Sequence, residues 1–225
     1  MRIAGRIVDR MHQRILETAR PGIPKDQVVA EVYQTGISGI EGAGGDYPSI
    51  VPLVCAGAEA ATPHLTWNSE LLRRDEGVFF EVAGVHKRYH CPTSRTLYFG
   101  KPPKKFIEAE KAVLEGIDAG LDRAQPGQRC EDISKAFFDT MARHGVHKEG
   151  RCGYGIGLSY PPDWGEHTFS LRPGDDTVLA AGMAFHFMPA LWFDDWGLEI
   201  TETVLITGAG HECLSHVERK LLVVD

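Results

Sequence analysis

An internal duplication with a spacing of 105 residues constrains the fold of this chain more than any other feature. An Ala-x-Pro-Gly segment occurs at residues 19–22 and again at residues 124–127. Apolar or aromatic positions beyond the two segments match in register: Val28 with Ile133, Val32 with Phe137, and Tyr33 with Phe138. Solenoid repeats recur at about 20–50 residues, so this period is too long for a solenoid. The pattern predicts two similar halves of one domain.

Each half is expected to begin with two helices and to continue with strands. Apolar residues recur at spacings of three and four within residues 3–16 and 106–121, as on one stripe of a helix. Pro-Gly ends both stretches, and a second helix is predicted after each, the first over residues 26–36. Strands are predicted at residues 49–55, 78–82, 88–98, 183–191 and 197–207. The expected fold is α+β, with helices covering one face of a mostly antiparallel sheet.

The segment from residue 158 to residue 181 is rich in Pro, Gly, Asp and Trp. It is longer than most connections in a compact domain, and we predict a loop here. Loops of this length line a site more often than they merely connect elements. The segment therefore contributes candidate binding residues.

Composition and charge exclude several classes of function. The chain has 24 Lys and Arg against 31 Asp and Glu, a net charge of −7, which argues against a nucleic-acid partner. No apolar run approaches the roughly 18 residues of a membrane helix, so no membrane partner is expected. The five cysteines include no C-x-x-C pair, and we interpret them as reduced thiols of a cytoplasmic protein. The first 20 residues do not resemble a targeting peptide.

Two titratable residues are candidates for catalysis. Glu81 lies in the apolar segment 78–83, and a buried carboxylate without a partner is costly and has a raised pKa. It is either a general base or nucleophile, or a paired acid of the core or an outward-pointing residue of an edge strand. His64 lies in a proline-containing turn, where a histidine is either an acid-base group or an ordinary surface residue.

The sequence lacks the usual spacings of metal and nucleotide sites. There is no H-E-x-x-H motif and no cluster of Cys and His, and Asp163, Glu166 and His167 are merely close together in the long segment. The glycine-rich residues 153–157 are followed by no lysine and no helix pattern, so they do not predict a phosphate-binding loop. These features predict no metal and no cofactor.

Five short segments carry a resemblance to a known family. The chain resembles the ectoine hydrolases of the creatinase and methionine-aminopeptidase superfamily at residues 44–48 (GGDYP), 63–67 (PHLTW), 88–92 (RYHCP), 160–166 (YPPDWGE) and 185–189 (FHFMP). The resemblance implies a pita-bread fold, with two pseudo-symmetric halves around a curved sheet. It also implies that residues 1–225 form a catalytic domain, without the N-terminal domain that these hydrolases carry ahead of it.

The same resemblance allows the ligands of the superfamily's metal site to be checked. Metal-dependent members bind a pair of metals through two Asp, one His and two Glu. Matching the segments places Glu81 at the first Asp, whereas the other positions hold Pro92, Tyr154, Met188 and Thr201, with Glu202 beside the last. Proline, methionine and threonine cannot form a carboxylate cage for hard divalent ions. The resemblance therefore implies a metal-free member.

Metal-free members of the superfamily, creatinase among them, use a histidine at the position of His64 as acid-base group. The resemblance thus implies that Glu81 and His64 open the cyclic amidine ring of ectoine to N-acetyl-diaminobutyrate. Glu81 would attack the amidine carbon or deprotonate a water, and the sequence leaves both routes open. A metal-dependent Xaa-Pro dipeptidase or aminopeptidase, and an inactive binding module of the same fold, are the alternatives.

A small zwitterionic substrate such as ectoine needs partners for both of its charges. Its amidinium would contact Asp163, Glu166 or Glu202, and Trp67 or Trp164. Its carboxylate would contact Arg95, His167 or Tyr154, although Arg95 could instead brace its strand. Family analogy also implies a homodimer.

Overall fold

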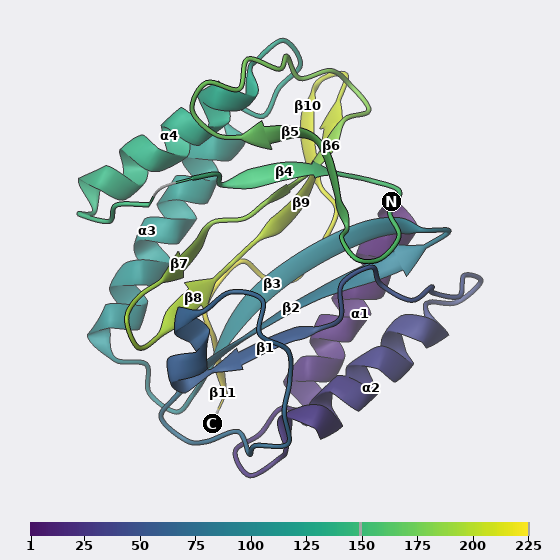
Figure 1. The fold of residues 1–225 in the computed structure, drawn as a ribbon, viewed down its shortest axis with the longest axis vertical. Helices are drawn as coiled ribbons and strands as arrows, with labels where there is room; N and C mark the ends of the chain where they lie inside the picture. Colours follow the sequence, from purple (N-terminus) through teal and green to yellow (C-terminus); the bar gives the residue numbers. More distant parts are fainter. Residues whose placement is uncertain (149, 225) are drawn as a thin grey trace.

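The computed structural model describes residues 1–148 and 150–224 and contains two helix pairs with strands between them (Figure 1). In the first half, the helices are α1 (Arg2–Thr18) and α2 (Lys25–Ser38). They are followed by β1 (Leu53–Ala56), the short 3-10 helix η1 (Gly57–Ala61), β2 (Gly77–His86) and β3 (Tyr89–Phe99). The C-terminal β11 (Leu222–Val224) pairs in parallel with β3 and completes a sheet in the order β1-β2-β3-β11.

The second half repeats this plan with more strands. Its helices are α3 (Lys104–Leu121) and α4 (Cys130–Arg143). Its strands are β4 (Gly153–Ile156), β5 (Gly165–Leu171), β6 (Ala184–Phe187), β7 (Ala190–Trp192), β8 (Gly197–Glu199), β9 (Glu202–Thr207) and β10 (Gly210–Cys213). Five of them form a sheet in the order β10-β9-β6-β4-β5, and β7 and β8 form a separate hairpin.

Helix α1 shows how the apolar stripe determines the packing. Its stripe is buried against the sheet, and Ile7, Val8 and Ile15 are fully inaccessible. Gly84 of β2 makes this close contact possible, because a Cβ there would lie 2.1 Å from the Ala4 carbonyl oxygen. The helix therefore lies directly on the backbone of β2.

The predicted duplication is visible in the two turns that join each helix pair. Gly22 and Gly127 both adopt left-handed φ angles, +89° and +88°. Their amides donate to equivalent carbonyls, of Leu72 in the first half and of Leu179 in the second. Helices α2 and α4 each contain 14 residues. The expected α+β class and the pita-bread arrangement of two similar halves are confirmed.

Three strand predictions need correction. The single strand expected over 197–207 is divided into β8 and β9, with a break at Ile200 and Thr201. The composition of segment 158–181 predicts a loop throughout, but the segment contains β5, which pairs with β4 at the edge of the sheet. Its polar residues 166–168 are exposed on that edge, so no alternating apolar pattern marks the strand. The single strand expected over 183–191 is divided into β6 and β7, because the backbone breaks at Met188 and Pro189.

The structure also bears on the cysteines and on membrane insertion. The five cysteines are free, and burial raises the pKa of Cys91 and Cys152 to about 12. These thiols are therefore protonated at neutral pH. In the described part of the chain, no helix combines the length and the hydropathy that a bilayer crossing requires.

Candidate functional site

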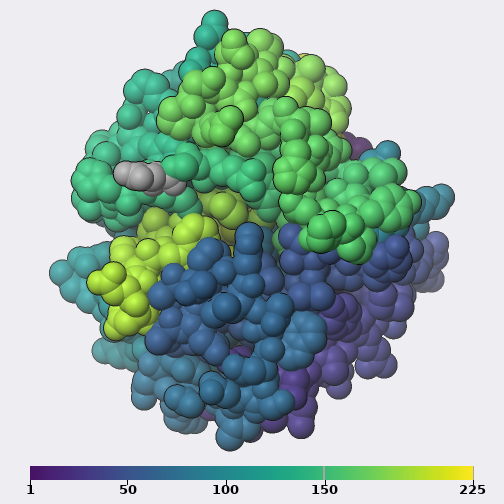
Figure 2. Space-filling view, viewed as in Figure 1, coloured from purple at the N-terminus to yellow at the C-terminus, as the bar shows by residue number. Residues whose placement is uncertain are grey.

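A cavity of about 400 Å³ lies where the two halves meet. The first half contributes Leu53 and His64 to its lining, and the second contributes Arg151, Tyr154, Asp163 and Trp192. Figure 2 shows this face hollowed where dark blue atoms of the first half meet green and yellow-green atoms of the second. The structure thus brings together His64, Tyr154 and Asp163, three of the residues that the sequence singled out.

Glu81 lies in the middle of β2, directly opposite Leu53 of β1 and Ser94 of β3. Residues directly opposite each other in antiparallel strands point to the same face of the sheet. Leu53 lines the cavity, so the Glu81 side chain lies on the cavity side as well. The side chain is only 4% exposed.

The surroundings of the Glu81 carboxyl group favour its protonated form. Within the described residues, no hydrogen-bond donor contacts this carboxyl group, and Nδ1 of His186 lies 3.8 Å from its Oε1 atom. Burial raises the pKa of Glu81 well above its usual range, and the nearby Glu199 carboxylate raises it further. A buried carboxyl group with a perturbed pKa beside a cavity is a candidate for catalysis.

A chain of buried hydrogen bonds runs beside Glu81. The Trp164 indole donates to the Tyr154 hydroxyl at 2.9 Å, and this hydroxyl lies 3.0 Å from Nδ1 of His186. Nε2 of His186 is in turn 2.8 Å from the Thr201 hydroxyl, which also accepts the Ser94 amide at 2.7 Å. Burial lowers the pKa of His186 to about 3, so its ring is neutral and can accept at one nitrogen and donate at the other.

Glu199 is a second buried carboxyl group at the site. The Trp192 indole donates to its Oε1 atom at 3.0 Å, whereas Oε2 is buried without a partner among the described residues. Burial raises the pKa of Glu199 to about 7. Neither Glu199 nor His186 was predicted from the sequence, although both lie between apolar neighbours as Glu81 does, and this was the available signal.

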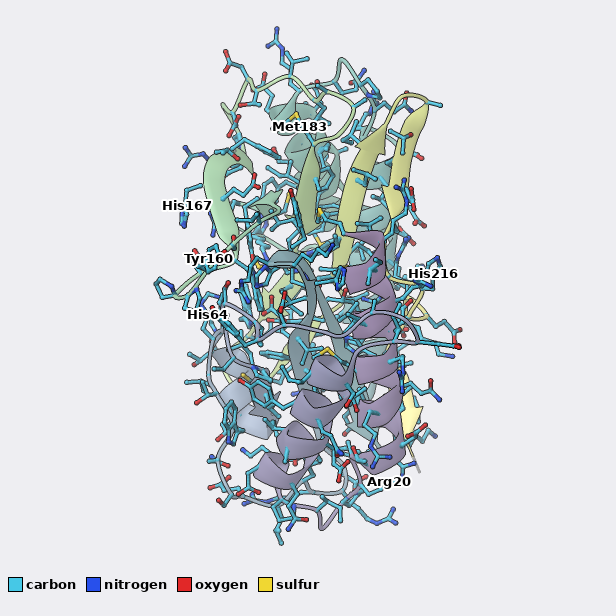
Figure 3. The ribbon with its side chains drawn as sticks, turned by 90° about the vertical axis from the view of Figure 1, so that its right-hand side faces the viewer. Arg20, His64, Tyr160, His167, Met183 and His216 are labelled. Atoms are coloured by element: carbon cyan, nitrogen blue, oxygen red, sulfur yellow. The ribbon has the colours of Figure 1, made fainter. Side chains whose placement is uncertain are left out.

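His64 and the residues around Asp163 lie along one edge of the molecule. His64 follows η1 in an exposed loop with a φ of 65°, and Figure 3 shows it on the same edge as Tyr160 and His167. Nε2 of His167 is 2.9 Å from the Asp163 carboxylate, whose other oxygen accepts the Gly165 amide. Asp163 is thereby held in place at the cavity.

Other predicted substrate-binding residues lie away from the cavity lining. Glu166 is exposed on β5, and Trp67 packs edge-on against Tyr33 of α2. Trp164 is 1% exposed, and its indole donates a hydrogen bond to the Tyr154 hydroxyl. It therefore positions the Tyr154 side chain rather than facing the cavity. None of these three is among the lining residues.

Arg95 and Glu202 also differ from the expectation of substrate contact. Both are buried, and Nη2 of Arg95 donates to Glu202 Oε1 at 2.7 Å. The remaining donors of Arg95 bind backbone carbonyls of Ser94, Thr201, Val217 and Glu218. All of these partners belong to the protein. The structure therefore fits the alternative in which Arg95 braces its strand and does not contact a substrate.

The residues at the superfamily's metal positions do not fit a pair of divalent ions. Pro92, Met188 and Thr201 provide no carboxylate, and Tyr154 is engaged with Trp164 and His186. In residues 1–148 and 150–224, no group of three His, Cys, Asp or Glu side chains could hold a metal. The remaining carboxyl group, Glu81, favours a proton. These positions therefore lack the carboxylates that the superfamily's paired metal site requires.

Comparison with known proteins identifies relatives of this chain. The chain is 56% identical to the ectoine hydrolase of Halomonas elongata over 229 aligned residues, which cover 99% of this chain and 57% of that protein. It is 40% identical to the uncharacterized hydrolase/peptidase y4tM of Sinorhizobium fredii, covering 100% of this chain and 57% of the relative. The chain thus spans somewhat more than half the length of these relatives.

Solved structures show the same fold. The dipeptidase PepE of Mycobacterium ulcerans superposes with a TM-score of 0.86 at 25% identity, over 99% of this chain and 58% of that one. A dipeptidase of Pyrococcus horikoshii OT3 has a TM-score of 0.87 at 20% identity, over 100% of this chain and 61% of that one. The model of metallopeptidase family M24 matches residues 1–208. The chain therefore belongs to metallopeptidase family M24.

Proposed function

We propose that this chain is the catalytic part of a metal-independent hydrolase that opens the cyclic amidine ring of ectoine. The observation that carries the proposal is the Glu81 carboxyl group, buried beside the cavity without a hydrogen-bond donor in the described chain. The 56% identity to a protein named ectoine hydrolase supports the choice of substrate. The donor set at the superfamily's metal positions supports a reaction without a metal.

Substrate binding would favour the ionised form of Glu81, which is the form that reacts. Burial disfavours the charge of this carboxyl group and raises its pKa, so the group favours a proton. A bound amidinium places a positive charge next to Glu81 and favours the carboxylate. Asp163, the carboxylate in the cavity lining, supplies a further counter-charge for the cation.

In the reaction we favour, the Glu81 carboxylate forms a bond to the amidine carbon, and the π electrons of the C=N bond move to nitrogen. His64 protonates one ring nitrogen as its bond to that carbon breaks, which opens the ring. Water then attacks the same carbon and gives one proton back to His64. The C–O bond to Glu81 breaks as the C=O bond of the amide forms, and the second proton of the water goes to the released amine. The product is an N-acetyl-diaminobutyrate. A general-base route, in which Glu81 deprotonates the attacking water, uses the same two residues.

The residues at the superfamily's metal positions weigh against the first alternative, a metal-dependent Xaa-Pro dipeptidase. An Xaa-Pro dipeptidase of known structure has the same fold as this chain. The metal ligands of the superfamily, however, are replaced in this chain. A binding module would bind ectoine without turnover. The proposal also includes a cytoplasmic location, which we infer from the reduced cysteines, and a homodimer, which we infer from the family.

The test follows ring opening of ectoine by proton NMR with the protein dialysed against EDTA. We expect turnover to persist in EDTA and to fall by more than about a hundredfold in Glu81→Gln, because the amide lacks both nucleophilicity and basicity. Glu108→Gln, at an exposed position of α3, is the matched control. Turnover that is abolished by EDTA and restored by a divalent metal, or a Glu81→Gln variant with the parent rate, would refute the proposal.

A further inference from the structure

The cavity carries charges of both signs on its second-half wall. Arg151 precedes β4 and Asp163 precedes β5, and both line the cavity with Tyr154 of β4. Burial raises the pKa of the Tyr154 hydroxyl, and of the two charges on this wall Arg151 lowers that pKa whereas Asp163 raises it. A cavity with both a fixed cation and a fixed anion suits a ligand that carries both charges itself.

Arg151 has a defined position in this wall. Its guanidinium carbon lies 4.4 Å from the centroid of the Tyr154 ring, within the range of a cation–π contact. The Tyr154 ring is itself fixed, because its hydroxyl is bonded to Trp164 and His186. Arg151 thus packs on an aromatic ring that is held in place at the cavity wall.

The other candidates for binding a substrate carboxylate are occupied or less suited. Arg95 is buried and directs its donors into the protein. His167 contacts Asp163, and the Tyr154 hydroxyl belongs to the buried chain of hydrogen bonds. Of the described residues that line the cavity, Arg151 alone is an arginine or a lysine.

We propose that Arg151 binds the carboxylate of the substrate and makes the site selective for amidines that carry an acid group. This inference rests on the proposed function and names the determinant of substrate class within it. A guanidinium presents a planar fork of N–H donors that matches the two oxygens of a carboxylate. With the carboxylate held by Arg151, the amidinium ring is directed toward Asp163 and Glu81. The same cation disfavours amidines that lack the acid group, because they bring only positive charge.

The experiment compares two ligands that differ only in the acid group. Ectoine carries the carboxylate, and 2-methyl-1,4,5,6-tetrahydropyrimidine is the same ring without it. Their dissociation constants are measured by calorimetry with the 225-residue chain and with Arg151→Gln and Arg151→Lys. Arg123→Gln, at an exposed arginine after α3 that does not line the cavity, is the matched control. The kcat and KM for ectoine are measured on the same proteins.

We expect Arg151→Gln to weaken ectoine binding by about ten- to a hundredfold, the range for a lost charge-assisted contact. Arg151→Lys keeps the charge without the fork and should lie in between. Binding of the carboxylate-free ring should change by less than about threefold or become tighter, because the repelling cation is gone. The loss should appear in KM more than in kcat.

The outcomes separate this inference from the proposed function. Equal losses for both ligands would mean that Arg151 only supports Tyr154, and unchanged ectoine binding would mean that another group holds the carboxylate. Either result overturns the inference while ring opening by the parent chain stands. Selective, Arg151-dependent binding of ectoine without ring opening would instead support the subsite and refute the hydrolase. A parent chain that does not bind ectoine would refute both.

Discussion

The two halves of the molecule are built on one plan but contribute different chemistry to the site. Glu81 of β2 and His186 of β6 are 105 residues apart, the same interval that separates Gly22 from Gly127. Each lies opposite a residue that lines the cavity, Glu81 opposite Leu53 and His186 opposite Tyr154. They come within 3.8 Å of each other where the halves meet. The duplication therefore placed equivalent positions face to face, and one became a carboxyl group and the other an imidazole.

The halves differ most in what connects these strands to the next. In the first half, β2 and β3 are joined by Lys87 and Arg88, both with positive φ, as in a tight hairpin turn. In the second half, the hairpin of β7 and β8 is inserted between β6 and β9. That insertion carries Trp192 and Glu199 to the site. The first half therefore has a tight connection at this point, whereas the second half carries a hairpin that adds Trp192 to the cavity lining.

The strongest test of this comparison removes the buried ion pair that joins the halves. Arg95 on β3 and Glu202 on β9 are almost inaccessible, and removing Arg95 leaves the Glu202 carboxylate buried with Arg219, 3.3 Å away, as its remaining cation among the described residues. Arg95→Gln is expected to lower the free energy of unfolding by about 3–5 kcal/mol, measured by chemical denaturation. Lys135→Gln, which breaks the exposed pair with Asp139, should cost at most about 1 kcal/mol. Equal effects of the two variants would show that the pair does not hold the halves together.

A second, smaller effect comes from the carboxyl group that the inserted hairpin contributes. Burial raises the pKa of Glu199 from the ordinary 4.5 to about 7, so the folded protein holds a proton that the unfolded chain has already lost. Stability is therefore expected to fall as the pH rises from about 4.5 through about 7. Glu199→Gln keeps an acceptor for Trp192 but cannot ionise, so its melting temperature should fall less over this range.

The measurement is the melting temperature at about pH 4.5 and about pH 8 for the parent chain, Glu199→Gln and the surface control Glu108→Gln. We expect the drop in Glu199→Gln to be smaller than that of the parent by on the order of 5 °C, whereas Glu108→Gln should follow the parent. If Glu199→Gln instead shows the parent's full drop, Glu199 is not the group that couples stability to pH.

The smallest expected effect tests whether the two turns are energetically equivalent. Gly22 and Gly127 have positive φ and open space where a Cβ would lie, so alanine would be strained without a clash. Gly22→Ala and Gly127→Ala should each cost about 1–2 kcal/mol of unfolding free energy, and by similar amounts. Gly208→Ala, at an open position without positive φ, should cost less. A clear difference between the two turn variants would show that the halves have diverged in stability as well as in chemistry.

The sequence by itself determined the duplication, the four helices and most of the strands, because apolar spacing and Pro-Gly turns act locally. It also identified Glu81, since a carboxylate in an apolar strand is conspicuous. His64 was a candidate from the turn in which it lies, and the resemblance to a family suggested roles for His64, Tyr154 and Asp163. The structure places these three around one cavity. Strands β4, β5, β10 and β11 were not predicted. Strand β5 was missed because its order depends on backbone pairing with β4 at the sheet edge.

Only the tertiary structure decided which polar residues face the cavity and which face one another. Arg95 and Glu202 were expected to contact a substrate, yet they bind each other in the core. Arg151, His186 and Glu199 were not among the site residues predicted from the sequence. In the structure they lie around Tyr154 and Glu81. The physical reason is that burial, and with it the pKa of a carboxyl group or an imidazole, depends on neighbours supplied by distant segments. Local sequence carries the periodicity of a helix or strand, whereas the charge state of a buried group is a property of the folded assembly.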